Sequence, residues 1–277
     1  MTGGRRAAGW SAAVMIAFVR RDLREALTYK LSFLSSVTGI LLSSATFYFV
    51  AKLVPAGTPA LGPFGGDYFS FAVVGVAFAG LLGMFQEGLA SVVRGAQVSG
   101  TLEALLVTPV PVPAILFGSS LYGLLFQVFR TVLHLGVALA FFGLALGRVN
   151  AAGVVAVGFL TVLCFLSIGI LSASFVLVYK RGNPFSWVLG TVSGLLGGVV
   201  FPVVLLPPWI RWASSLLPVT YALDGMRKSL LASAPFSAIL PDVAALAAFD
   251  ALLLPASLVA FRLAVRKAKK DGTLAQF

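Results

Sequence analysis

Residues 151–179 read AAGVVAVGFLTVLCFLSIGILSASFVLVY, a stretch without a charged side chain. A bilayer core about 30 Å thick needs about 20 apolar residues in one helix, so this run is long enough to cross a membrane. The whole chain has the same character: 59% of its 277 residues are hydrophobic and 10% are charged, against about 25% charged in soluble domains. These features predict an all-α polytopic membrane protein.

Five other apolar runs reach the same length, so six transmembrane spans are predicted within one domain that covers residues 1–277. The predicted spans are residues 31–54, 68–90, 115–147, 151–179, 185–206 and 243–265. The third run is longer than an upright helix needs, and it must tilt or project into water.

Basic residues lie at the ends of the apolar runs and predict the orientation of the chain. Cytoplasmic loops carry an excess of Lys and Arg. If the N-terminus is cytoplasmic, that side holds fourteen basic residues and the other side five. Both termini are therefore predicted to lie in the cytoplasm. Because the net charge of +11 is spread along a membrane topology, it does not indicate nucleic-acid binding.

Residues 10–30 place apolar and basic side chains on opposite faces of a helix, which predicts a helix lying in the membrane interface. A solvated N-terminal helix fits the same pattern. The chain has one cysteine, Cys164, and one histidine. It therefore offers no disulfide, and we expect no metal, cofactor or catalytic site on it.

Residues 99–113, SGTLEALLVTPVPVP, interrupt the apolar pattern between the second and third spans. Thr101 can cap a short helix, Glu103 suits its positive end, and Pro109 ends it. One face of this helix carries Leu102, Leu105 and Leu106. An apolar face on a cytoplasmic helix must be covered by the bilayer, by the N-terminal helix or by a partner protein.

Two stretches resemble ATP-binding-cassette (ABC) type-2 permeases. The first runs from Arg94 through Gly100-Thr-Leu-Glu-Ala-Leu-Leu-Val-Thr-Pro109. The second contains Phe201-Pro202, Leu206-Pro207, Trp209, Leu217-Pro218-Val-Thr-Tyr221, Asp224 and Arg227. The resemblance covers nearly the whole chain, and it implies a bacterial inner-membrane permease that works as a homodimer or with a similar chain.

The resemblance also implies that residues 94–109 form a coupling helix, which docks on a separate ABC ATPase present in two copies. The residues expected at that contact are Arg94, Gly100, Thr101, Leu102, Glu103, Leu105, Leu106, Thr108 and Pro109. ATP and Mg²⁺ would bind the ATPase. The residues themselves agree with this division, because no Lys follows a Gly in this chain, and the phosphate-binding G-x-x-x-x-G-K-[ST] loop is absent.

The segment 207–241 is too apolar for an ordinary loop and is broken by prolines, so we expect short re-entrant helices on the external side. It forms either an outer gate or a cap that only stabilises the spans. The residues assigned to this gate are Pro202, Pro207, Trp209, Pro218, Tyr221, Asp224 and Arg227.

Small residues form stripes in two predicted spans. Gly190, Gly194 and Gly198 recur at every fourth position of the fifth span, and Gly39 and Ser43 belong to a similar stripe in the first. Such stripes allow close helix packing in lipid. In the resembled family the second and fifth spans border the path at the dimer centre. The candidates for a translocation path or dimer seam are Gly190, Gly194, Gly198, Val199 and Phe201.

Charged and polar groups at membrane depth are costly and informative. Arg130 and His134 lie four residues apart, hence on one helical face. Glu87 and Asp250 are the candidate ion-pair partners of Arg130. A structural ion pair and a proton relay both remain open.

Together these features predict the membrane subunit of an ATP-driven exporter, not an enzyme, for an amphiphilic, lipid-linked or drug-like substrate. Two alternatives stay open. A secondary transporter or channel would use Arg130 and His134, and a membrane-embedded lipid enzyme would need clustered polar residues, whereas the polar residues here are dispersed.

Overall fold

The computed structural model describes residues 30–55, 57–98, 112–179 and 184–270, and every regular element in these ranges is a helix. Five of the described helices are long and apolar enough to cross a membrane. They are α2 (Lys30–Ala51), α3 (Tyr68–Val98), α5 (Val112–Phe142), α6 (Ala151–Tyr179) and α10 (Phe236–Lys270). The predicted all-helical, multi-pass architecture is confirmed, whereas the predicted N-terminal interfacial helix lies outside the described residues.

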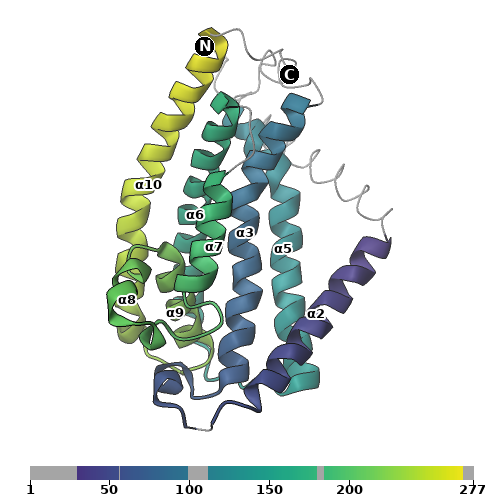
Figure 1. The fold of residues 1–277 in the computed structure, drawn as a ribbon, viewed down its shortest axis with the longest axis vertical. Coiled ribbons are helices and arrows are strands. Elements are labelled where there is room, and N and C mark those ends of the chain that lie inside the picture. The colour runs from purple at the N-terminus through teal and green to yellow at the C-terminus, as the bar shows by residue number, and fades with distance from the viewer. Residues whose placement is uncertain (1–29, 56, 99–111, 180–183, 271–277) are drawn as a thin grey trace, which may run out of the picture.

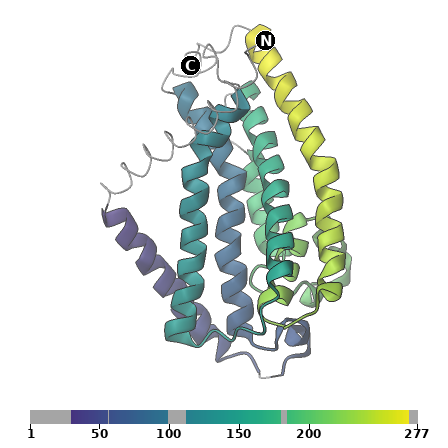
Figure 2. The ribbon, with the colours of Figure 1, turned by 180° about the vertical axis from the view of Figure 1, so that it is seen from behind.

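Helices α3, α6 and α10 run in one direction along the bundle, and α2 and α5 run in the opposite direction (Figures 1 and 2). Helix α3 packs against α5 and α6, and α10 packs along α6. Three side chains of α3, Phe71, Val73 and Val74, have no exposed surface. Helix α3 therefore forms the centre of the bundle.

Helix α2 lies at the margin of this bundle and leans away from it (Figures 1 and 2). Its main contacts with the other long helices are those with α3 and α5. Leu34 and Leu42 are 60% and 64% exposed. Much of the apolar surface of α2 is therefore free for lipid or another chain.

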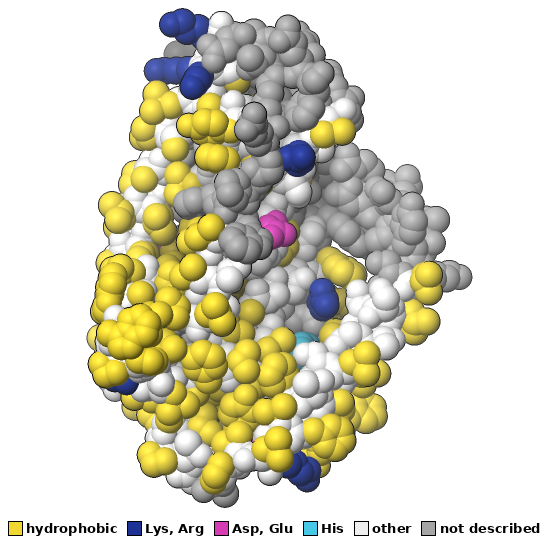
Figure 3. All heavy atoms as spheres, viewed as in Figure 1, with side chains coloured by type: hydrophobic (Ala, Val, Ile, Leu, Met, Phe, Trp, Pro, Cys, Tyr) yellow, Lys and Arg dark blue, Asp and Glu magenta, His cyan; other side chains and the backbone are white. Residues whose placement is uncertain are grey.

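The ends of α3 and α10 lie at the same end of the bundle, opposite the short helices α8 (Pro208–Ser214) and α9 (Pro218–Leu230) (Figure 1). Arg94 near the end of α3 therefore shares this end with the basic residues that finish α10. Figure 3 shows basic side chains gathered at the tip of α10. This grouping agrees with the charge pattern of the sequence, and the orientation in the membrane stays a prediction.

The predicted fifth span, residues 185–206, is not one helix. Helix α7 (Pro184–Leu196) has 13 residues, so it is about 20 Å long and too short for a bilayer core of about 30 Å. Gly198 takes a left-handed conformation with φ +75°, and Pro202 precedes a single 3₁₀ turn, η2 (Val203–Leu205). Gly198 and Pro202 prevent the helix from continuing, so α7 is only about half as long as a membrane-spanning helix.

Two further predicted boundaries are also corrected. Helix α5 ends at Phe142, five residues before the predicted limit of the third span, because Gly143 has a left-handed φ of +73°. Helix α10 begins at Phe236, inside the segment 207–241 that was expected to be wholly re-entrant. The rest of that segment forms α8 and α9, as the prolines at their first positions favour.

Side-chain caps explain where the neighbouring helices begin. The Oδ2 atom of Asp67 accepts the backbone N–H of Ser70 at 2.8 Å, just after the 3₁₀ helix η1 (Pro59–Phe64). The Oδ1 atom of Asn150 accepts the N–H of Gly153 at 3.0 Å at the start of α6. Both bonds satisfy N–H groups that a first helical turn leaves free.

The short helix α9 is tied into the bundle rather than lying on its surface. The N–H groups of Gly147 and Asn150 donate to the carbonyls of Leu230 and Ser229 at 3.0 and 2.9 Å. At Gly153 an added Cβ would lie 2.6 Å from the Ser229 hydroxyl. Helix α9 thus closes one end of the bundle against α6 and the link that precedes it.

Candidate functional site

The predicted coupling segment lies almost wholly outside the described residues. Arg94 is the exception: it is exposed near the end of α3. The other eight residues assigned to the coupling contact, from Gly100 to Pro109, fall in the undescribed range 99–111. Their role as an ATPase contact therefore stays a prediction from the sequence.

The most constrained polar contact of the described chain is made by Arg227 of α9. Its side chain has no exposed surface. Nε donates to the Phe71 carbonyl at 3.1 Å, Nη1 to the Gly198 carbonyl at 2.8 Å and Nη2 to the Val199 carbonyl at 2.7 Å. The guanidinium also lies 3.5 Å from the centre of the Phe71 ring. Three of its five N–H groups are thus used on backbone carbonyls.

This contact joins residues from two sites that are predicted separately from the sequence. Arg227 was assigned to the external gate, whereas Gly198 and Val199 were assigned to the translocation path. Since α7 has ended at Leu196, the carbonyls of Gly198 and Val199 have no continuing helix to bond them. The guanidinium therefore replaces the backbone donors that the broken helix lacks.

Gly75 makes this contact possible, and the sequence analysis did not identify it. A Cβ at Gly75 would lie 1.9 Å from the Val199 carbonyl oxygen and 2.2 Å from Nη2 of Arg227. Only a residue without a Cβ fits there. Helix α3 contains several other glycines, so no sequence pattern distinguishes this one.

The other residues assigned to the predicted gate lie around α8 and α9. Pro202 is buried ahead of η2, Pro207 and Pro218 lie at the starts of α8 and α9, and Trp209 is 73% exposed. Tyr221 donates its hydroxyl to the Ser215 carbonyl at 3.1 Å. This end of the molecule therefore combines a buried anchor with exposed aromatic surface, a mixture typical of the membrane interface.

Asp224 lies one turn before Arg227 on α9. Burial raises the pKa of the Asp224 carboxyl to about 6, and Arg227 and Lys228 oppose this rise without cancelling it. Burial likewise lowers the pKa of Arg227 to about 9, so its guanidinium stays charged at pH 7. Lys228 pairs with Asp242 at 2.6 Å and links α9 to α10, a contact that the sequence analysis missed.

The predicted glycine stripe does not form one surface. Gly190 and Gly194 are exposed on α7. Gly198 lies beyond the helix and, with Val199, faces inward to Arg227, while Phe201 is half-buried. The stripe therefore divides into an exposed pair and a buried junction.

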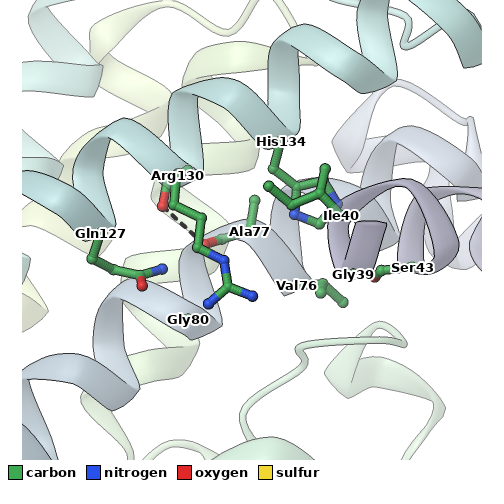
Figure 4. A pocket seen from close by; sticks show the side chains of 10 residues that line it. Gly39, Ile40, Ser43, Val76, Ala77, Gly80, Gln127, Arg130 and His134 are labelled. Carbon is green, nitrogen blue, oxygen red and sulfur yellow. Dashed lines mark hydrogen bonds between the residues drawn. The ribbon is translucent and has the colours of Figure 1, made fainter. Parts of the chain in front are cut away.

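A polar recess lies between α2, α3 and α5 and has a volume of about 220 Å³. Figure 4 shows the Arg130 and Gln127 side chains extending across α3, with the His134 ring beside Ile40 of α2. The lining residues are Gly39, Ile40, Ser43, Val76, Ala77, Gly80, Gln127, Arg130, Thr131 and His134. Arg130 and His134 thus share one site, as their spacing indicated.

Neither candidate partner forms an ion pair with Arg130 in the part of the chain that the structure describes. Glu87 is exposed on α3. Asp250 is 7% exposed within α10, and neither of its carboxyl oxygens has a hydrogen-bond partner. No cluster of three or more metal-ligating side chains occurs among the described residues.

Comparison with known proteins extends these observations. A family profile described as ABC-2 type transporter matches residues 13–231. An inner membrane transport permease, YadH of Escherichia coli K12, is 29% identical over 168 residues, and a YadH of Shigella flexneri matches equally. These alignments cover 60% of this chain and 64% of each relative, so the chain spans less than two thirds of the curated relatives it matches.

Proposed function

This chain belongs to the ABC-2 type transporter family, and from that premise we propose that it is the membrane subunit of an ATP-driven exporter. The observation that carries the proposal is the family match over residues 13–231, on a chain whose described helices form a multi-pass bundle. A separate ATPase, in two copies, would supply ATP hydrolysis and bind the ATP and Mg²⁺. The sequence of this chain has no phosphate-binding loop of its own.

We propose that the segment from Arg94 to Pro109 transmits movement from the ATPase. Arg94 lies at the end of α3, the central helix of the bundle. The same helix carries Phe71 and Gly75, which contact Arg227 near its other end. A displacement of α3 by the ATPase would therefore act directly on the junction between α7 and η2.

The junction of Arg227 with Gly198 and Val199 is the proposed outer gate. Here the helix is interrupted, and the free backbone carbonyls accept hydrogen bonds from one side chain of α9. Such a junction has few backbone bonds to lose when α3 and α9 separate. The alternative to a gate is a cap that only stabilises the bundle, and it predicts no change in this contact during transport.

A second copy of this chain is proposed to pack against α7. Gly190 and Gly194 are exposed there, and Val188 and Leu195 beside them are 49% and 59% exposed. Small residues let helices approach closely in lipid. A homodimer seam along α7 would place the gate junction near the centre of the dimer.

The test of the ATPase contact is a charge reversal, Glu103→Arg, with Arg148→Glu as a matched reversal at an exposed site at the other end of the bundle. Surface substitutions usually change stability by no more than about 0.5 kcal/mol, so both variants should insert and purify. Glu103→Arg should lose ATPase co-purification and substrate-stimulated hydrolysis, because the reversed charge disfavours docking. Normal co-purification and transport by Glu103→Arg would leave this segment as a mere linker and remove the case for coupling.

A further inference from the structure

The recess between α2, α3 and α5 is positively charged. Its lining includes Arg130 and contains no acidic residue. Arg130 lies about two turns inside the apolar stretch Gly123–Phe142 of α5, which is long enough to span a membrane. A cation at this depth is costly unless an anion or water reaches it.

The Thr131 hydroxyl of the recess donates to the Ala77 carbonyl at 3.2 Å, but three other polar side chains of the recess lack such a partner among the described residues. The Arg130 guanidinium and the Gln127 amide make no hydrogen bond or ion pair with a described residue. His134 is 7% exposed, and its Nε2 atom has no hydrogen-bond partner. Of these side chains only His134 is buried, whereas Gln127 is half-buried and Arg130 is exposed. Because buried polar groups are nearly always bonded, the unbonded Nε2 atom of His134 beside this open cation indicates a ligand or water in the recess.

The size of the recess limits that ligand. A volume of about 220 Å³ is below the roughly 300–1,000 Å³ of pockets that enclose drug-sized molecules. It equals the liquid volume of about seven waters. A phosphate or carboxylate group fits, but an acyl chain must lie outside.

Helix α2 leaves room for such a chain. Figure 3 shows the surface hollowed between the bundle and α2, with basic and histidine side chains in the hollow. Gly39 and Ser43 of α2 line the recess, and a Cβ at Gly39 would meet nothing within 4 Å. The small residues of α2 thus leave an opening rather than a close helix contact, and exposed apolar side chains such as Leu42 lie on the same helix.

We propose that this recess binds the anionic head group, a phosphate or carboxylate, of a membrane amphiphile, with Arg130 as the charged ligand and Gln127 and His134 beside it. Charge-assisted hydrogen bonds to the guanidinium hold the head group, and the acyl chain lies in the lipid along α2. This inference names a substrate class for the proposed exporter and rests on that function for the claim of transport, whereas binding itself does not require the ATPase.

The test is native mass spectrometry of the purified chain in detergent with oleoyl lysophosphatidic acid as the probe. Two comparison ligands separate the contribution of the phosphate from that of the acyl chain. Monooleoylglycerol has the same acyl chain without the phosphate, and inorganic phosphate has no acyl chain. We expect the lysophosphatidic acid to bind at least about tenfold more tightly than either, since a charged hydrogen bond and the chain both contribute.

Two variants locate the binding. Arg130→Gln removes the charge, with Arg148→Gln as the control at an exposed position outside the recess. Gly39→Leu fills the recess and keeps the charge, with Gly136→Leu as the control, because Gly136 is also open but does not line the recess. Both recess variants should weaken binding at least about tenfold, and the controls should stay within about twofold.

Three results would overturn the proposal. Equal binding of monooleoylglycerol would show an apolar site, equal binding of inorganic phosphate would show a soluble-anion site, and unchanged binding in Gly39→Leu and Arg130→Gln would place the ligand elsewhere. Because no ATPase is present, these failures are distinct from loss of ATPase co-purification, which would overturn the exporter proposal alone.

Discussion

The guanidinium of Arg227 lies 2.7 Å from the carbonyl oxygen of Val199, in a position without solvent exposure. Two residues that are 28 positions apart in sequence are joined where a half-length helix ends. Side chains usually complete a helix terminus locally, through a cap or a turn. Here the donor comes from another helix, so the position of η2 depends on the packing of α9.

Arg227→Met should strongly reduce stability. The carbonyls of Gly198 and Val199 would lose their only described side-chain donor, and each buried acceptor left without a hydrogen bond costs about 1–3 kcal/mol. The apparent melting temperature in detergent should fall by roughly 10 °C. Arg227→Lys should recover only part of this, since one ammonium cannot reproduce the planar guanidinium.

The control for Arg227 is Arg211→Met. Arg211 also donates to backbone carbonyls, those of Val204 and Leu206, but it is exposed. Water can replace those bonds, so we expect a loss of about 1 kcal/mol or less. Equal losses in the two methionine variants would contradict a special role for the buried guanidinium.

Gly75→Ala should destabilise the protein, whereas Gly83→Ala on the same helix should not. The Cβ at position 75 would overlap the Val199 carbonyl oxygen and Arg227, and at position 83 it meets nothing within 4 Å. Overpacking costs about 1–3 kcal/mol, while alanine favours a helix over glycine by about 1 kcal/mol. Melting curves of the two purified variants check this, and a Gly75→Ala protein as stable as Gly83→Ala would refute the close approach.

Asp224→Asn should raise stability at pH 7.5 more than at pH 5. The pKa of the buried carboxyl is raised to about 6 in the folded chain, above the value of about 3.9 expected when unfolded. The folded state therefore binds the proton more tightly, and the stability of the wild type falls as pH rises from about 4 to 6. At pH 5 the folded carboxyl is still mostly neutral while the unfolded one is already ionised, so asparagine should raise stability there by roughly half as much as at pH 7.5.

The measurement for Asp224 is the difference in melting temperature between variant and wild type at the two pH values. A difference that is the same at pH 5 and pH 7.5 would mean that Asp224 does not titrate in this window.

Single cysteines should test the orientation in a Cys164→Ala background. Gly95 is exposed at the end of α3, and Val149 is exposed in the link between α5 and α6, at the opposite end of the bundle. The charge pattern predicts that an impermeant thiol reagent labels Val149→Cys in intact cells and leaves Gly95→Cys unlabelled. The reverse pattern would invert the topology and place the predicted coupling segment outside the cell.

The sequence alone determined the features that depend on consecutive residues. The run Ala151–Tyr179 was predicted as a span with the bounds that α6 has, because an uncharged stretch of that length has few alternatives to a membrane helix. The prolines at positions 208 and 218 begin α8 and α9, since proline is favoured in a first helical turn. The resemblance to ABC type-2 permeases, carried by short motifs, is confirmed by the family match.

Tertiary structure alone decided the features that depend on distant residues. The apolar run continues to residue 206, but the helix ends at Leu196. This early end is tolerated because Arg227 donates hydrogen bonds to the carbonyls of Gly198 and Val199. Likewise, the spacing of Arg130 and His134 predicts that they share one face of α5. The spacing does not predict the recess on that face, which exists because Gly39 of α2 lies opposite. Apolar length is a local property of the chain, whereas the satisfaction of buried polar groups depends on which helices pack together.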